Sequence, residues 1–163
     1  THPKTMGRAL PQVHQGEHMN DLAPEVDWLP VLQGWHHDDY LDHVRQYEAA
    51  GVKLQNLPLV GLGSVCRRQN TSMAEGLIRY LAGLGIRLHG FGFKLGGLAR
   101  CSRWLTSSDS LAWSFTARRG IPLPGCTHRN CANCLRYALR WRERAVAAAS
   151  CGRRRHCQGE LFV

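Results

Sequence analysis

The sequence predicts an α/β fold with a parallel sheet, because two patterns alternate along residues 28–115. Short apolar runs end in glycine or polar residues, as buried strands do, and each is followed by a stretch with apolar residues at helical spacing. Strands that alternate with helices form βαβ units, in which consecutive strands lie parallel. We count four such units, and the 163 residues, 44% of them hydrophobic, suffice for one domain with a hydrophobic core.

The first two units have the clearest boundaries. A strand is predicted at residues 28–34 and is followed by a helix over 37–50. A second strand, at 57–64, precedes a helix whose N-cap is Asn70 or Thr71. The apolar residues on one face of that helix are Leu77, Ile78, Leu81 and Leu84.

The third and fourth units are less regular. A strand at residues 86–93 precedes a weaker helical stretch at 98–105. The fourth unit is the stretch 106–115, in which apolar residues alternate as in a strand around Asp109. After a Pro/Gly loop, a further helix is predicted from about residue 134 to 149.

The charge of the chain indicates a polyanionic partner. Lys and Arg number 21 against 12 Asp and Glu, which gives a formal net charge of +9. Only Lys4, Lys53 and Lys94 are lysines, so the positive charge is almost wholly guanidinium, a group whose planar fork suits phosphate. A nucleic acid therefore fits as a partner, although excess charge also serves solubility.

Neither a membrane helix nor a secretory leader is predicted. No run approaches the roughly 20 apolar residues that a membrane helix needs, and the first residues lack a charged head followed by an apolar core. Three of the seven cysteines, Cys126, Cys131 and Cys134, fall within nine residues, which favours metal binding in a reducing compartment over disulfides. We therefore expect a soluble, cytoplasmic protein that does not bind membranes.

Three predicted strands end in glycine-containing motifs, which include Gln33, Gly61 and Gly90. Parallel α/β folds bind ligands beyond the carboxyl ends of their strands, and a glycine there lets a flat ligand approach the backbone. The amide of Gln33 can both donate and accept hydrogen bonds, as the edge of a nucleobase requires. The alternative is that these glycines only form tight turns between strand and helix.

Asp109 is the candidate catalytic carboxylate. It lies among Ser107, Ser108 and Ser110, next to an apolar run. A carboxylate beside a buried strand costs free energy unless it is hydrogen-bonded or has a function. The alternative is that Asp109 caps a turn or a helix, as Asp beside Ser often does.

The cysteine cluster is the strongest local signal for a metal, with the spacing C-x-H-x2-C-x2-C. Its members are Cys126, His128, Cys131 and Cys134. Thiolates and imidazole at this spacing fit a tetrahedral structural Zn²⁺ site, in which four protein ligands leave no position for a catalytic water. Two alternatives remain: His156 or Cys157 could replace His128, or the thiols could bind no metal.

Arginines crowd the C-terminal part of the chain. On the helix predicted from residue 134, Arg136, Arg140 and Arg144 recur every four positions and share a face. Such a stripe could follow a phosphate backbone. The alternative is a solvated helix face whose apolar residues pack inward. Those apolar residues are Leu135, Leu139 and Val146.

Taken in order, these motifs resemble the C-terminal half of tRNA-guanine transglycosylases, and more closely the deazapurine DNA modification transglycosylases of phages and bacteria. The resemblance covers about residues 28–144, and the order and spacing of the motifs make it specific. The motifs are Val31-Leu32-Gln33-Gly34, Val60-Gly61-Leu62, Leu88-His89-Gly90-Phe91-Gly92, Ser108-Asp109-Ser110, and the Cys-x2-Cys pair followed by Leu135-Arg136-Tyr137.

The resemblance implies part of a (β/α)8 TIM-like barrel and a pentosyltransferase that replaces guanine with a 7-deazaguanine in DNA. Asp109 then corresponds to the nucleophile that attacks C1′ of the sugar and forms a covalent glycosyl-enzyme intermediate. Gln33 corresponds to the amide that reads the base edge, and Gly61 to the backbone contact beside it. Gly90 corresponds to the glycine that keeps the floor of the pocket open.

The resemblance also bears on the metal. Cys131 and Cys134 correspond to two of the family's zinc ligands, and the family takes its fourth ligand, a histidine, from well downstream, as His156 would be. Because the Arg-rich tail has no clear register, we prefer His128 as the fourth ligand. The partners implied are DNA or tRNA, a 7-deazaguanine base, and a second chain that completes the barrel.

Four segments follow from these interpretations. They are a lead-in at 1–27, half of the barrel at 28–125, a zinc-binding segment with its helix at 126–149, and an Arg-rich tail at 150–163. A function of another class is also compatible with them: a zinc-stabilised, Arg-rich nucleic-acid-binding module without catalytic activity.

Overall fold

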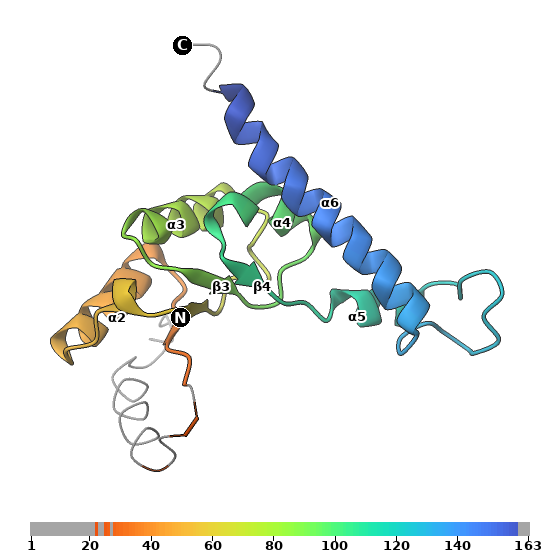
Figure 1. Cartoon of the computed structure of the whole chain (residues 1–163), viewed down its shortest axis with the longest axis horizontal. Coiled ribbons are helices and arrows are strands. Elements are labelled where there is room, and N and C mark those ends of the chain that lie inside the picture. The colour runs from red at the N-terminus through yellow and green to blue at the C-terminus, as the bar shows by residue number, and fades with distance from the viewer. Residues whose placement is uncertain (1–21, 23–24, 27, 160–163) are drawn as a thin grey trace, which may run out of the picture.

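A four-stranded parallel sheet forms the centre of the fold (Figure 1). The structure is a computed structural model that describes residues 22, 25–26 and 28–159. The strands are β1 (Val31–Leu32), β2 (Val60–Leu62), β3 (Leu88–Gly90) and β4 (Ser107–Ser108). They follow one another across the sheet in chain order, and each neighbouring pair is parallel. The predicted parallel sheet is therefore confirmed, whereas the partial TIM-like barrel stays a prediction.

The helices are α2 (His37–Ala49), α3 (Ser72–Gly83), α4 (Leu95–Cys101), α5 (Ala112–Arg119) and α6 (Leu135–Gly159). The first three cover one face of the sheet, whereas α5 lies beside α6. In Figure 1, α2, α3 and α4 lie on one side of the strands, and α6 packs along α4. None of the helices in the described part of the chain is long and apolar enough to cross a membrane.

The hydrophobic core lies between the sheet and these helices. Leu32, Leu62 and Leu88 are fully buried and belong to one cluster with Tyr40 of α2 and Ile78 of α3. Because side chains alternate between the two faces of a strand, the strand residues next to each of these leucines point to the opposite face. That opposite face carries the candidate active site.

The first two predicted helices are confirmed, and their starts follow from local hydrogen bonds. Thr71 caps α3, since its Oγ1 accepts from the N–H of Ala74 at 3.2 Å. At the start of α2, the Asp39 carboxylate accepts from the N–H groups of His36 and Trp35, both at 2.7 Å. These two backbone hydrogen bonds lower the pKa of Asp39, and such capping of orphan N–H groups stabilises a helix start.

Three predicted elements differ in the structure. The strand expected within 106–115 is shorter than predicted: β4 ends at Ser108, because pairing with β3 involves only residues 107–108, and α5 occupies residues 112–119. The third helix begins at residue 95, earlier than predicted, and continues as a 3-10 turn. The C-terminal helix runs past 149 because Gly152 packs against α4 instead of ending the helix.

The predicted segments are only partly visible. Of the lead-in at residues 1–27, only Leu22, Glu25 and Val26 are among the described residues. Of the tail at 150–163, the first ten residues belong to α6.

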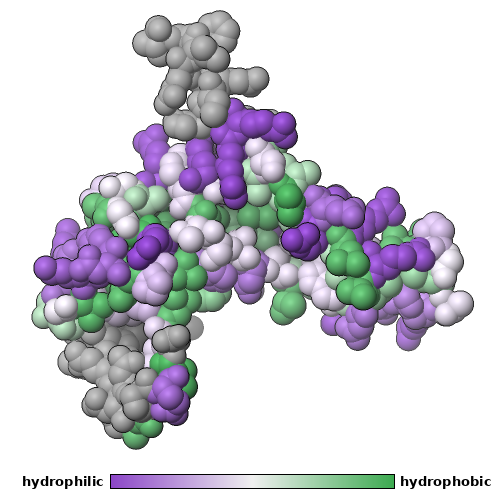
Figure 2. Space-filling model, in the orientation of Figure 1, coloured by the Kyte–Doolittle hydropathy of each residue, from purple (hydrophilic) through white to green (hydrophobic). Residues whose placement is uncertain are grey.

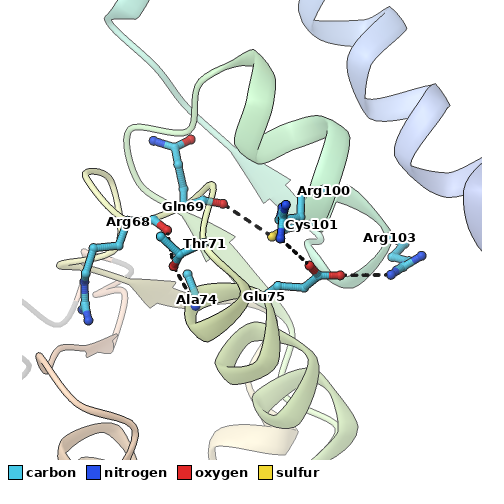
Figure 3. A network of polar contacts seen from close by, with 8 residues as sticks. All are labelled: Arg68, Gln69, Thr71, Ala74, Glu75, Arg100, Cys101 and Arg103. Atoms are coloured by element: carbon cyan, nitrogen blue, oxygen red, sulfur yellow. Dashed lines mark hydrogen bonds and ion pairs between the residues drawn. The ribbon is translucent and has the colours of Figure 1, made fainter.

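A polar network ties α4 to α3 (Figure 3). The carboxylate of Glu75 on α3 accepts hydrogen bonds from Arg100 at 3.0 Å and from Arg103 at 3.3 Å. Cys101 is buried beside this network, and burial raises the pKa of its thiol to about 11, so Cys101 stays protonated at neutral pH. The network fixes α4, and with it the turn that leads from β3 into α4.

Gly152 marks a close approach of α6 to α4. A Cβ at Gly152 would lie 2.6 Å from the carbonyl oxygen of Ala99 and 2.6 Å from Oγ of Ser102. Gly152→Ala is therefore expected to lower the free energy of unfolding by about 1–3 kcal/mol, despite the better helix propensity of alanine. Chemical denaturation measures this change. Gly76→Ala is the control, because a Cβ there meets nothing within 4 Å and should stabilise α3 by about 0.5–1 kcal/mol.

Candidate functional site

Residues that follow the four strands form a row at the carboxyl edge of the sheet. Leu32 pairs with Leu62, Leu62 with Gly90, and Gly90 with Ser108. Continuing this register by one residue aligns Gln33, Gly63, Phe91 and Asp109. Asp109 therefore comes directly after β4, at the end of the sheet where parallel α/β folds bind ligands.

Gln33 and Asp109 lie on the face opposite the helices. Gln33 follows Leu32, and Asp109 follows the residue that is aligned with Leu32 and buried Leu62 across the sheet. Because side chains alternate between the two faces of a strand, Gln33 and Asp109 both point to the open face. Two contacts agree with this. A Cβ at Gly63 would lie 3.0 Å from Cγ of Gln33, and Asp109 faces His89, the middle residue of β3.

The turn after β3 orients the carboxylate of Asp109. The N–H of Gly92 donates a hydrogen bond of 2.8 Å to Oδ1 of Asp109. Gly92 has a φ of +67°, a conformation that glycine adopts without strain. The backbone of Asp109 joins the same turn, because its carbonyl oxygen accepts from Phe93 N–H at 2.9 Å. Asp109 is thus held by the neighbouring strand, while 60% of its side chain stays exposed.

His89 is a site residue that sequence reasoning missed. Its Nε2 lies 3.8 Å from Oδ1 of Asp109, and its Nδ1 lies 2.8 Å from Oγ of Ser107 on β4. The ring also meets Phe91 edge-on, with the centroids 4.8 Å apart. The signal was present in the strand pattern, since position 89 lies between buried Leu88 and Gly90 and must point to the open face.

The two candidate glycines face opposite sides of the sheet. A Cβ at Gly61 would lie 2.6 Å from the Phe91 ring, so an aromatic ring covers Gly61 on the open face. A Cβ at Gly90 would lie 2.6 Å from the ring of Phe93, which is fully buried in the core. Glycine at position 90 is therefore required by core packing, and the base-pocket roles of both glycines stay predictions.

Two side chains that sequence reasoning also missed hold the loops at this edge. Arg68 donates to the carbonyl oxygens of Gly34 and Ser64, and thereby joins the loops after β1 and β2. Gln69 is buried and donates to the carbonyl oxygen of Gly92 at 3.3 Å. Gln69 thus supports the turn whose N–H binds Asp109. No spacing rule identifies the contacts to Gly34 and Gly92, because they join residues of different βα units.

The predicted metal ligands converge in space. One donor atom from each of the four residues lies within 4.8 Å of the others. The four residues are Cys126, His128, Cys131 and Cys134. The Sγ atoms of Cys126 and Cys134 are 4.0 Å apart, and Nε2 of His128 is 3.1 Å from Sγ of Cys131. Zn–S bonds of about 2.3 Å in a tetrahedron separate two sulfurs by a similar distance, so the donor set fits zinc.

The backbone around this cluster favours a thiolate at Cys134, whereas desolvation and the neighbouring thiols raise the pKa of the Cys126 thiol. Cys134 directly precedes α6, and hydrogen bonding from the backbone N–H of Tyr137 lowers the pKa of the Cys134 thiol. Buried Cys131 accepts from the N–H of Leu123 at 3.3 Å. The side chains of the alternative ligands, His156 and Cys157, lie outside the described residues. Among the described side chains, His128 completes the four-ligand set.

The arginine stripe of α6 is exposed. Arg136, Arg140 and Arg144 are all exposed, and Figure 2 shows hydrophilic residues along this helix. The inward packing considered for the apolar residues of this helix is wrong. Leu135, Leu139 and Val146 are 72%, 51% and 52% exposed. The helix instead packs through small residues such as Ala145 and Ala148, because its close approach to α4 leaves no room for larger ones.

Arg140 and Arg144 also line a hollow of about 340 Å³ together with Tyr137 and Trp141 of the same helix and Leu123. The hollow combines cationic and aromatic side chains. Phosphates and nucleobases are bound by this combination of groups.

The whole candidate region matches one known family. The family model of deoxypurine in DNA protein A, DpdA, matches residues 12–161. No curated protein and no solved structure is similar enough to this chain to match it. Because the matched range includes both the Asp109 edge and the cysteine cluster, the chain belongs to the DpdA family, a family of DNA 7-deazapurine modification.

Proposed function

We propose that this chain carries the nucleophile of a base-exchange transglycosylase, which replaces guanine with a 7-deazaguanine derivative in DNA. One observation carries the proposal: the Asp109 carboxylate and the Gln33 amide lie in one row, on the open face and at the carboxyl edge of a parallel sheet. Membership of the DpdA family supports DNA as the substrate.

The proposed reaction has two displacements at C1′ of one nucleotide. An oxygen of Asp109 attacks C1′, the C1′–N9 bond breaks, and guanine leaves with the electron pair and takes up a proton. The incoming base then attacks C1′ through its own ring nitrogen, releases a proton and displaces Asp109. Because one glycosidic bond replaces another, the exchange needs no ATP.

The other predicted residues have distinct parts in this proposal. Gln33 reads the edge of the base by accepting and donating hydrogen bonds, and Gly61 offers its backbone beside it. Gly90 keeps the floor of the pocket open, as the resemblance implies. The target base must leave its stack before Asp109 can reach C1′, and the arginines of α6 hold the strand during that step.

Zinc has a structural part in the proposal. Cys126, His128, Cys131 and Cys134 would hold the ion and fix the segment between α5 and α6. Four protein ligands fill a tetrahedral zinc, so the ion takes no part in the displacement.

A second function has one observation in its favour. In the described part of the chain, the ion-pair partner of Asp109 is His89, and no second carboxylate pairs with Asp109. A zinc-stabilised module that binds nucleic acid without exchanging bases would need no second acid. In that case the exposed arginines of α6 would carry the function alone.

One assay separates these functions. The chain is incubated with double-stranded DNA, single-stranded DNA or tRNA and with radiolabelled guanine, and the label bound to polymer is counted. We expect incorporation into DNA that is absent with Asp109→Asn. Binding without incorporation in any arm supports the module, and incorporation into tRNA alone supports a tRNA-directed transglycosylase.

A further inference from the structure

His89 is fixed in place on the open face of the sheet. Its side chain is only 17% exposed, although it belongs to no apolar cluster. The hydrogen bond of 2.8 Å between Nδ1 and Oγ of Ser107 holds one edge of the ring, and Phe91 packs against the ring edge-on. These two contacts leave Nε2 directed at Asp109.

Both contacts to the Asp109 carboxylate fall on the same oxygen. Gly92 N–H donates to Oδ1 at 2.8 Å, and Nε2 of His89 lies 3.8 Å from Oδ1. Across the described residues, Oδ2 has no hydrogen-bond partner. When the Ser107 hydroxyl donates to Nδ1, the neutral ring carries its proton on Nε2, so an N–H faces the carboxylate.

We propose that His89 is a positioning residue for Asp109: the Gly92 amide holds Oδ1, and the His89 ring lies beside the same oxygen with Nε2 at 3.8 Å, so that Oδ2 is the atom that attacks C1′. The inference rests on the proposed base exchange. In this step the Oδ2–C1′ bond forms while the C1′–N9 bond breaks, and the electron pair leaves with the base. His89 is not consumed. Its effect is geometric, because contacts at Oδ1 restrict rotation of the carboxylate and keep Oδ2 on the side away from Gly92 and His89.

Kinetics of variants test this role. His89→Leu removes the N–H and is expected to lower kcat roughly 100-fold with KM for the base unchanged within about twofold, since a misplaced nucleophile costs rate and not binding. His89→Gln keeps an N–H near the position of Nε2 and should recover kcat to within about tenfold of the wild type. Ser107→Ala frees the ring and should give an intermediate loss.

Three kinetic results would overturn the proposal. The first is a His89→Leu protein with wild-type kcat. The second is a loss confined to KM. The third is a His89→Gln protein as slow as His89→Leu, which would mean that the shape of the ring matters and its N–H does not.

A spectroscopic measurement separates failure of this inference from failure of the exchange reaction. In ¹⁵N-histidine-labelled protein, Asp109→Asn should move the Nε2 resonance of His89, whereas Asp42→Asn on the exposed face of α2 should not. An Nε2 resonance that does not respond to Asp109→Asn overturns the contact whatever the exchange assay gives. If the resonance responds to Asp109→Asn but the wild-type protein exchanges no bases, the proposed reaction is overturned, and with it the attack by Oδ2.

Discussion

Asp109→Asn is expected to reduce base exchange by at least about 10³-fold, because an amide oxygen is too weak a nucleophile to attack C1′. Asn retains an oxygen that can accept from Gly92 N–H, so the turn after β3 should keep its shape. DNA binding and thermal stability should therefore stay close to wild-type values. Two assays measure the effect: counting of labelled base in DNA, and denaturing gels that detect a covalent protein–DNA intermediate.

The matched control for this substitution is Asp42→Asn. Asp42 is exposed on α2 and pairs with Arg45, away from the carboxyl edge of the sheet. The Asp42→Asn protein should exchange bases at the wild-type rate and form the same covalent intermediate. If the Asp109→Asn protein exchanged bases within tenfold of the wild type, another group would be the nucleophile.

Cys131→Ser is expected to remove bound metal and to unfold the segment between α5 and α6. Cys131 is the buried ligand of the cluster, and structural zinc contributes about 10–16 kcal/mol of binding free energy in small zinc domains. Among the described residues, the hydrophobic cluster between the sheet and its helices includes none from 120–134, so the sheet and α2 to α4 should stay folded. Metal analysis should give one zinc per wild-type chain and little per variant chain. Hydrogen exchange should show lost protection only near the cluster.

Cys66→Ser controls for the loss of a thiol as such. Cys66 is exposed in the loop after β2 and is not among the four clustered residues. This variant should keep its zinc, and a chelator should destabilise it as much as the wild type. A wild-type chain purified without zinc, and with full protection in residues 126–134, would contradict the metal site.

Local patterns in the sequence were sufficient to predict the alternation of strands and helices. Hydrophobic periodicity and N-cap residues depend on neighbours along the chain, so α2 and α3 were predicted close to their observed bounds. The cysteine cluster is equally local, because its four ligands fall within nine residues and converge without help from the rest of the fold. The strand ends with Gln33 and Asp109 were also recognisable, although their roles depend on the resemblance.

Elements whose identity depends on distant partners could not be predicted in this way. Residues 110–115 alternate like a strand, yet β4 ends at Ser108 and the chain turns into α5, because the sheet offers β4 only two residues of pairing. The apolar residues of α6 were expected to be buried, yet Leu135 and Leu139 are exposed. The helix reaches α4 through small residues, and Gly152 makes the closest contact.

The sequence by itself determined the class of fold, the residue types of the candidate site and the cluster of candidate metal ligands, since each of these depends on spacing along the chain. Only the tertiary structure decided which atoms meet. Strand register placed His89 and Gly92 beside Oδ1 of Asp109. It also turned Gly90 toward Phe93 in the core. Register and side-chain direction result from the packing of several βα units at once, and no single segment of the sequence contains that information.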